Sequence, residues 1–307
     1  MSRKGSGKRE AFRTLRGGGP VSLREHPPKR REGEIMKIAR KPVVTTVPTT
    51  PVYDAIQIMV KEGFRRLPVA DPGTKKLKGI ITAMDIIDYL GGGNKFEIIR
   101  KRHGGNFYKA INEPIKFIMT SKVVSIETTG KIDEAIELMK QHNVGGLPVI
   151  DEEGKIWGII TERDITFLFA GKIGGVKVSS IMSTNVVTIS PKESIFMAEK
   201  TMIGKGFRRL PLVHEGKLTG IVTVMDILRF FGGSEVFHHL KSGTIMQVLQ
   251  TEIGEIATKK LVTIHPEADI GEAARIMEEN NVGALPVMEN DRLVGIITER
   301  DFFKVIV

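Results

Sequence analysis

The chain has 307 residues, 41% of them hydrophobic, and it contains no cysteine. This length suffices to bury a large core without disulfides or metals, and the lack of cysteine excludes disulfides, thiolate metal sites and cysteine nucleophiles. The apolar runs are too short to span a bilayer and we expect no secretory signal, so we predict a cytoplasmic protein without a membrane anchor.

The first predicted segment, residues 1–35, is a basic tail. The formal net charge of the chain is +10, and residues 1–34 hold ten basic against four acidic side chains, or +6. Such a segment has little apolar surface to bury and is expected to be disordered. It would suit a nucleic acid or another anionic partner. A solvated tail is the favoured interpretation, because stacking on bases would need aromatic side chains among the charges.

After the tail, one pattern of elements occurs four times. Each copy predicts a strand, a helix, a second strand, a turn, a third strand and a second helix. The spacing from the Thr or Ser after the first strand to a helical Ala is ten residues in every copy, and 13 more lead to a Pro. In chain order, the copies and the two connectors between them are expected at 36–90, 91–116 (connector), 117–170, 178–231, 232–255 (connector) and 256–307.

The elements within each copy follow the usual periodicities. Apolar residues at helical spacing predict the first helix, and its methionine is expected in the core rather than in a site (Met59, Met139, Met202 and Met277). The Leu-Pro and Gly-Ile-Ile-Thr runs predict buried strands. Proline cannot donate a hydrogen bond to a ladder, so we expect it at a strand start or edge.

The copies are of two alternating kinds. The first and third carry Phe-Arg-Arg-Leu-Pro, whereas the second and fourth carry Val-Gly-Gly-Leu-Pro or Val-Gly-Ala-Leu-Pro and end in Thr-Glu-Arg-Asp. This alternation is typical of the duplication of a two-repeat module.

A Thr-x-x-Asp motif follows the third strand of every copy. The spacing is that of a helix capping box, yet the motif also lies where a strand ends and a helix begins, a place where α/β layers bind anions. An Asp there can accept two hydrogen bonds from a vicinal diol such as a ribose. The motifs are formed by Thr82 and Asp85, Thr161 and Asp164, Thr223 and Asp226, and Thr298 and Asp301.

Arginines gather at two places in the pattern. The pairs Arg65-Arg66 and Arg208-Arg209 precede the Leu-Pro strands of the odd copies, and Arg163 and Arg300 lie inside the motif of the even copies. The guanidinium fork matches phosphate oxygens. Since neighbouring strand residues point to opposite faces, at most one arginine of each pair is expected to face a cleft, and a solvated salt bridge is the alternative for either pair.

No pattern in the chain indicates catalysis. The seven histidines show no metal-ligand spacing shared between copies, and no nucleophile lies near a base within the repeats. We therefore predict a protein that is not an enzyme and has no metal or cofactor.

The four copies resemble CBS domains, whose hallmark is Gly-h-x-Thr/Ser-x-x-Asp after a hydrophobic-Pro strand. The layout over residues 36–307 is similar to archaeal four-CBS proteins that resemble the γ subunit of AMP-activated protein kinase. The resemblance implies an α/β (α+β) fold in which adjacent repeats form two pseudo-twofold Bateman modules, stacked as a disc.

The resemblance also implies roles for site residues. The aspartates Asp85, Asp164, Asp226 and Asp301 would bind ribose hydroxyls, and Thr82, Thr161, Thr223 and Thr298 would lie near phosphates. Early-strand and proline positions would line adenine pockets, and the paired arginines would meet phosphate. The adenine-pocket positions are Thr45, Ser125, Thr188 and Thr263 together with Pro68, Pro148, Pro211 and Pro286.

Several functional interpretations stay open. The favoured one is a regulatory or energy-sensing protein that binds AMP, ADP or ATP and changes its packing or its docking to an unidentified protein partner or a second copy. The alternatives are a sensor of S-adenosylmethionine or a related nucleoside, and a nucleic-acid-binding protein acting through the tail. An enzyme such as inosine monophosphate dehydrogenase is rejected, because the chain has no cysteine and no barrel for that chemistry.

The even copies depart from the arginine pattern at Gly145-Gly146 and Gly283-Ala284. Their clefts would borrow arginines from a neighbouring repeat, hold an uncharged adenosyl ligand, or stay empty. We expect the odd copies, around Asp85 and Asp226, to dominate phosphate recognition.

Overall fold

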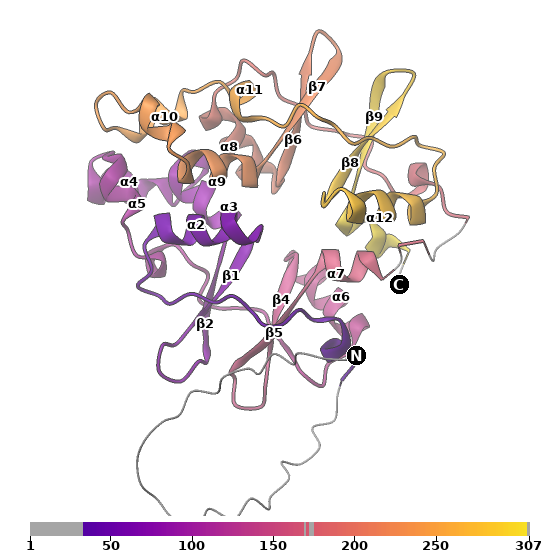
Figure 1. Cartoon of the computed structure of the whole chain (residues 1–307), viewed down its shortest axis with the longest axis horizontal. Coiled ribbons are helices and arrows are strands. Elements are labelled where there is room, and N and C mark those ends of the chain that lie inside the picture. The colour runs from indigo at the N-terminus through magenta and orange to yellow at the C-terminus, as the bar shows by residue number, and fades with distance from the viewer. Residues whose placement is uncertain (1–32, 169, 172–174, 306–307) are drawn as a thin grey trace, which may run out of the picture. The chain divides into compact units, whose positions relative to one another are not determined.

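The computed structural model describes residues 33–168, 170–171 and 175–305. Residues 1–32 of the predicted basic tail lie outside these ranges. Within the described ranges, no helix combines the length and the apolar character needed to cross a lipid bilayer. The structure confirms the four repeats, each built from helices and strands (Figure 1).

The first and third repeats share one order of elements, in which two helical segments come before a strand pair and a further helix follows it. In the first repeat these are α1 (Glu34–Ile38), α2 (Val52–Glu62), β1 (Arg66–Ala70), β2 (Leu77–Thr82), α3 (Ala83–Ile87) and the π-helix η1 (Asp88–Gly92). In the third they are η3 (Val178–Ser180), α8 (Ile195–Lys205), β6 (Arg209–His214), β7 (Lys217–Thr223) and α9 (Val224–Gly232). Helices α2 and α8 both end at a glycine with φ of 69°, Gly63 and Gly206, because a left-handed residue closes the last turn without steric cost.

The second and fourth repeats repeat this order. The second contains η2 (Ile115–Phe117), β3 (Ile126–Glu127), α6 (Ile132–Gln141), β4 (Gly146–Ile150), β5 (Ile156–Thr161) and α7 (Glu162–Phe167). The fourth contains α12 (Ile270–Glu279), β8 (Ala284–Glu289), β9 (Arg292–Thr298) and η5 (Glu299–Lys304). The segments before the second and fourth repeats hold α4 (Phe96–His103) and α5 (Phe107–Ile111), and η4 (Glu235–His239), α10 (Ile245–Leu249) and α11 (Ile253–Ile256).

The sheet of each repeat is small. The Leu-Pro strand pairs antiparallel with the strand that ends in the motif threonine, and the early segment adds a short parallel bridge on its other side. Pro148 is therefore the third residue of a central strand, β4, and the prediction of a strand start or edge is wrong for this proline. Pro68, Pro211 and Pro286 lie in strands of two-stranded sheets, where each strand is an edge as expected. In the first repeat Thr46 N donates to the carbonyl of Pro68 at 3.0 Å and Ala70 N donates to the carbonyl of Thr46 at 2.8 Å, so the early segment pairs with β1 from Pro68 onward. Proline has no N–H to donate on this side of the strand. Because the early segment pairs with β1 only from the proline carbonyl onward, no hydrogen bond of the ladder is lost.

The four predicted core methionines are fully buried, as expected from their helical spacing: Met59, Met139, Met202 and Met277. The first and third repeats share the largest hydrophobic core. Two smaller cores are centred on the second and fourth repeats, and they also take in Ile35 from the first repeat and Val178 and Ile181 from the third.

Adjacent repeats meet edge to edge, which agrees with the expected pairing into two modules. Arg40 of the first repeat bridges Ile159 of the second, and Ser183 of the third bridges Ile296 of the fourth. Helices join the two modules, because α2 packs against α9, α8 against η1, and α7 against both η5 and α12 (Figure 1). This arrangement brings the loops before all four Leu-Pro strands toward a common centre.

Candidate functional site

All four Thr-x-x-Asp motifs form the same local structure. The backbone N–H and the hydroxyl of each threonine donate to one carboxylate oxygen, Oδ2, of the aspartate three residues later. In the first repeat these distances are 2.8 and 2.6 Å, from Thr82 to Asp85. The capping interpretation is thus confirmed in every repeat. The capping hydrogen bonds from the threonine use only one of the two oxygens of each aspartate carboxylate.

The second oxygen, Oδ1, of each motif aspartate contacts a basic side chain. Three of these cations come from within ten residues of the aspartate, whereas the fourth, Arg40, is 124 residues away from Asp164. Each aspartate side chain is largely buried, so its charge needs such a partner. The local pairs are Lys95 with Asp85 at 2.5 Å, Arg229 with Asp226 at 2.5 Å and Lys304 with Asp301 at 2.8 Å.

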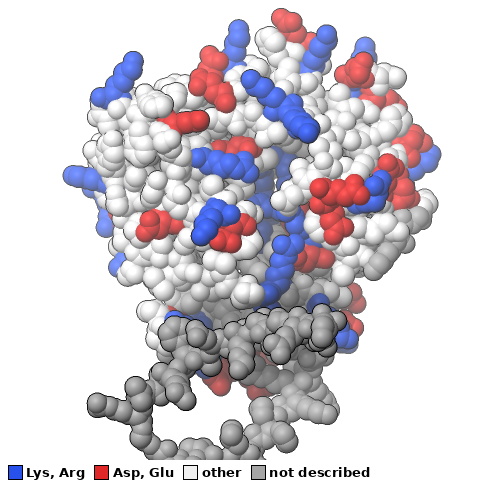
Figure 2. Space-filling model, viewed as in Figure 1, with Lys and Arg blue, Asp and Glu red and all other residues white. Residues whose placement is uncertain are grey.

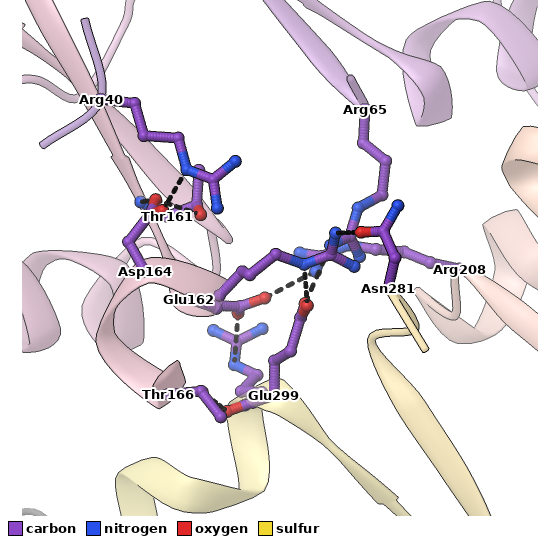
Figure 3. A network of polar contacts seen from close by, with 11 residues as sticks. Arg40, Arg65, Thr161, Glu162, Asp164, Thr166, Arg208, Asn281 and Glu299 are labelled. Atoms are coloured by element: carbon purple, nitrogen blue, oxygen red, sulfur yellow. Dashed lines mark hydrogen bonds and ion pairs between the residues drawn. The ribbon is translucent and has the colours of Figure 1, made fainter. Parts of the chain in front are cut away.

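Two buried glutamates organise the arginines at the centre. Glu299 of the fourth repeat accepts from Arg65 Nη2 at 2.9 Å and from Arg163 Nε at 2.6 Å. Arg163 also donates to Asn281 Oδ1 at 2.7 Å. Figure 3 shows Arg65, Asn281 and Glu299 converging from separate parts of the chain.

The second glutamate repeats the arrangement with the modules exchanged. Glu162 of the second repeat accepts from Arg208 Nη1 at 2.7 Å and lies 3.6 Å from Arg300 Nε. Arg300 donates to Asn143 and to the carbonyl of Met139. Both glutamates are only 2% exposed. Neither glutamate was predicted as a site residue, although its presence inside the Thr-x-x-Asp motif of the even copies alone was a signal in the sequence.

Positive charge exceeds negative charge in this cluster. Six arginines face two glutamates, and within the described residues no hydrogen bond joins Arg66 or Arg209 to a protein group. Burial and the neighbouring Arg208 lower the pKa of Arg66 to about 9, and burial and Arg65 lower the pKa of Arg209 to about 10. Both remain charged at neutral pH, so the centre is prepared for an anion. Figure 2 shows Lys and Arg side chains in a hollow near the middle of the face it displays.

Burial alone would raise the pKa of Glu299, but the Arg65 and Arg163 guanidiniums outweigh it and lower the pKa to about 2. The ionised carboxylate is therefore a stable part of the cluster at neutral pH.

The glycines that replace arginine in the even copies make room for it. A Cβ on Gly146 would overlap the guanidinium of Arg66, and a Cβ on Gly145 would overlap that of Arg208. At the equivalent place in the fourth repeat, a Cβ on Gly283 would lie 2.9 Å from the carboxylate of Glu299. Of the three possibilities left open for the even clefts, the structure favours arginines borrowed from another repeat.

Two equivalent clefts open beside this cluster. The first has an interior volume of about 90 Å³ and lies between the first repeat and the motif of the second. Its walls are Val43, Val44, Phe64, Arg65, Arg66 and Pro68 together with Thr161 and Arg163. The second, of about 860 Å³, has Val186, Val187, Phe207, Arg208, Arg209 and Pro211 together with Thr298, Arg300 and Asp301.

These walls correct two expectations. Both arginines of each pair line a cleft, because β1 and β6 begin only at Arg66 and Arg209, so strand alternation does not yet separate the pair. The backbones of Arg66 and Arg209 pair with Thr82 and Thr223 of the odd-repeat motifs. Their side chains nevertheless line clefts with residues of the even-repeat motifs, and Asp85 and Asp226 line neither cleft, because adjacent repeats meet edge to edge.

The other predicted site residues are placed as follows. Thr45 and Thr188 directly follow the cleft residues Val44 and Val187. Neither cleft is lined by Asp164 of the second-repeat motif, by the early-strand and proline positions of the even repeats, or by the odd-repeat motifs. The last two groups are Ser125, Pro148, Thr263, Pro286, Thr82, Asp85, Thr223 and Asp226. Within the described ranges, no three His, Asp or Glu side chains gather as metal ligands.

Comparison with known proteins agrees with the repeats. The family model of the CBS domain matches residues 33–92, 115–171, 178–233 and 253–307. Protein MJ1225 of Methanocaldococcus jannaschii is 40% identical over 273 residues, which are 88% of this chain and 98% of that protein. The crystal structure of MJ1225, which is described as a candidate archaeal homologue of g-AMPK, superposes with a TM-score of 0.85 at 38% identity over 89% of this chain and 99% of that one.

Two further similarities cover most of the chain. A 33.4 kDa protein in the ribosomal RNA operon of Thermofilum pendens is 33% identical over 267 residues, 87% of this chain and 89% of that protein. A conserved Pyrococcus horikoshii protein of known structure shares the fold, with a TM-score of 0.57 at 23% identity over 88% of this chain and 98% of that chain.

Proposed function

The chain belongs to the CBS domain family, and from that premise we propose that its two central clefts bind adenine nucleotides and that it serves as a regulatory, energy-sensing protein. Its ligands would be AMP, ADP or ATP, with no catalytic step and no resident cofactor. The observation that carries the proposal is the meeting, in one cleft, of an odd-repeat arginine pair with an even-repeat Thr-x-x-Asp motif.

Each part of such a ligand has a matching wall in the second cleft. Val187, Phe207 and Pro211 provide apolar surface for a base, and Asp301 offers a carboxylate for ribose hydroxyls. Arg208 and Arg209 provide the forked donors that phosphate oxygens prefer. The cleft volume of about 860 Å³ lies within the range of about 300–1,000 Å³ usual for small-molecule sites.

The regulatory step would follow from the contacts that hold the arginines without ligand. Arg65 of the first repeat pairs with Glu299 of the fourth, and Arg208 of the third pairs with Glu162 of the second. A phosphate that competes for these arginines weakens contacts running between the two modules. Binding would therefore favour a different packing of the modules, or a surface that a partner recognises, by population shift.

Calorimetric titration tests the proposal. Wild-type protein is titrated with AMP, ADP, ATP, S-adenosylmethionine and a short DNA duplex at moderate salt. Asp301→Asn should weaken every nucleotide, and Arg209→Ala should weaken ATP more than adenosine, because only the phosphates need the guanidinium. Arg275→Ala, which removes an exposed arginine of α12, is the matched control and should change neither affinity.

Equal weakening of ATP and adenosine by Arg209→Ala would argue against the phosphate role. Binding of S-adenosylmethionine but of no nucleotide would mean that the ligand of the clefts is an adenosyl nucleoside instead of AMP, ADP or ATP. Binding of the duplex alone, lost on deletion of residues 1–34, would assign the function to the basic tail.

A further inference from the structure

The cation that neutralises Asp164 differs in origin from the other three. Lys95, Arg229 and Lys304 reach their aspartates from within ten residues along the chain. Arg40 instead belongs to the first repeat, where it lines the first cleft, and crosses to Asp164 in the second repeat.

The position equivalent to Arg40 holds a different side chain in the second cleft. Arg40 lies five residues before Thr45, and the residue five before Thr188 is Ser183. The backbones match, because Arg40 N donates to Ile159 O at 2.8 Å and Ser183 N donates to Ile296 O at 2.9 Å.

The position three residues after the motif aspartate also differs between the two clefts. Lys304 lies three residues after Asp301, and the residue three after Asp164 is Phe167, which cannot neutralise a carboxylate. In the second cleft a lysine of the same helical turn supplies the charge. In the first cleft an arginine supplies it from across the opening, as Figure 3 shows for Arg40 and Asp164.

The two arrangements leave different amounts of space. The second cleft, which Asp301 lines, has a volume of about 860 Å³. The first cleft has a volume of about 90 Å³; Arg40 lines it together with Thr161 and Arg163 of the Asp164 motif, and we call it the Asp164 cleft after that motif. The smaller volume is below the range of about 300–1,000 Å³ that small-molecule sites occupy. A nucleoside therefore needs the Asp164 cleft to widen, and Arg40 is a lining side chain with enough exposure to move.

We propose that Arg40 is a displaceable plug that makes the Asp164 cleft the weaker of two nucleoside sites. The inference rests on the proposed function and adds that the two clefts fill at different ligand concentrations. One sensor would then respond over a wider range of ligand than two equal sites allow.

Arg40 has the properties of a plug that can leave. Its side chain is 52% exposed, whereas that of Asp164 is 6% exposed, so the guanidinium can return to water while the carboxylate stays in place. Its only described side-chain hydrogen bond is to Asp164 Oδ1, the oxygen that the capping box leaves available to a ribose hydroxyl. The backbone bridge to Ile159 holds the segment, so only the side chain needs to move.

The chain carries its own probe of this cleft. Trp157 is the single tryptophan, and Lys41 Nζ lies 4.2 Å from the centroid of its ring. Lys41 directly follows Arg40, so displacement of the plug should alter the fluorescence of Trp157. Filling of the Asp301 cleft should leave that fluorescence nearly unchanged.

The test compares fluorescence with calorimetry on the full chain, with adenosine and AMP as probes. In the wild type, calorimetry should show a stronger and a weaker step, and tryptophan fluorescence should follow the weaker one. Arg40→Ser, which installs the residue of the other cleft, should strengthen the fluorescence-detected step for adenosine by about tenfold or more, since it removes a charge-assisted hydrogen bond that the ligand must break. Lys37→Ser removes an exposed cation of the same segment and should change neither step.

A reciprocal variant guards against a folding defect in Arg40→Ser. Ser183→Arg combined with Lys304→Phe rebuilds the plug in the second cleft and should weaken the stronger, fluorescence-silent step by a similar factor. Unchanged or weaker adenosine binding at the fluorescent step in Arg40→Ser would overturn the plug while leaving nucleotide binding intact. Absence of any heat or fluorescence change in all four proteins would overturn the proposed function itself.

Discussion

Replacement of Glu199 by isoleucine should stabilise the protein. Glu199 on α8 is 0% exposed, and within the described residues neither of its carboxylate oxygens has a hydrogen-bond partner. Its Oε2 lies against Gly91, where a Cβ would approach it to 2.7 Å. The equivalent residue of the first repeat is Ile56, which packs against Gly232 in the same way, so isoleucine already fits this type of contact.

The magnitude follows from the burial of an unpaired polar group, which costs about 1–3 kcal/mol. Burial also raises the pKa of Glu199 well above its usual range. A carboxyl with a raised folded pKa holds its proton in the native state and loses it in the unfolded state. The pH-dependent part of its cost to stability is thus absent below the unfolded pKa, about 4.3, and grows as the pH rises from there toward the folded pKa.

The assay is thermal unfolding between pH 4 and pH 8. Glu199→Ile should raise the Tm by several degrees at neutral pH, at about 2–4 °C per kcal/mol, and its advantage over the wild type should shrink toward pH 4. Glu199→Gln should remove the pH dependence while keeping an unpaired polar group. Glu278→Ile, at an exposed position of α12, is the matched control and should stay within about 0.5 kcal/mol of the wild type.

Two results would refute the reasoning. One is a Glu199→Ile protein that is less stable than the wild type at neutral pH. The other is an advantage of Glu199→Ile that does not change with pH, which would mean that the carboxyl is ionised and has a partner in the native state.

Three further predictions concern the arginine cluster and the caps. Because the pKa of Glu299 is lowered to about 2, its ion pairs stabilise the fold above the unfolded pKa of about 4.3. Glu299→Gln should therefore be less stable than the wild type in urea at pH 7, and this difference in stability should be lost as the pH falls through about 2. A difference that does not depend on pH would contradict this. Gly145→Ala should cost about 1–3 kcal/mol in the same assay, since its Cβ meets Arg208, whereas wild-type stability would show that the guanidinium moves freely. Thr223→Ala removes a cap of α9 and should lower stability by about 0.5–2 kcal/mol; a neutral result would mean that the cap contributes nothing there.

Much of the local structure was predictable from the sequence. Helix α6 and strand β5 follow from apolar periodicity, and the capping boxes at Thr161 and Thr298 follow from residue types three positions apart. These features depend on neighbours along the chain, and each was repeated four times. Repetition therefore made even weak local signals reliable.

The prolines and the arginine pairs were placed less well. Pro148 lies in a central strand because its partner segment joins the ladder only after the proline, a detail of pairing that propensity does not contain. Both Arg65 and Arg66 line the cleft. Strand β1 begins only at Arg66, so Arg65 lies before the strand and the alternation of side chains between the two faces does not apply to the pair.

The sequence by itself determined the family, the repeats, the capped strand–helix junctions and the residue types available for a nucleotide. Only the tertiary structure decided which of them meet. Arg65 and Glu299 are 234 residues apart, and Arg40 and Asp164 are 124 apart, so no local pattern could pair them. Their contacts arise from the packing of whole repeats, which depends on the shapes of several buried surfaces at once. Because of that packing, the two corresponding clefts differ in the basic side chain that pairs with the nearby motif aspartate.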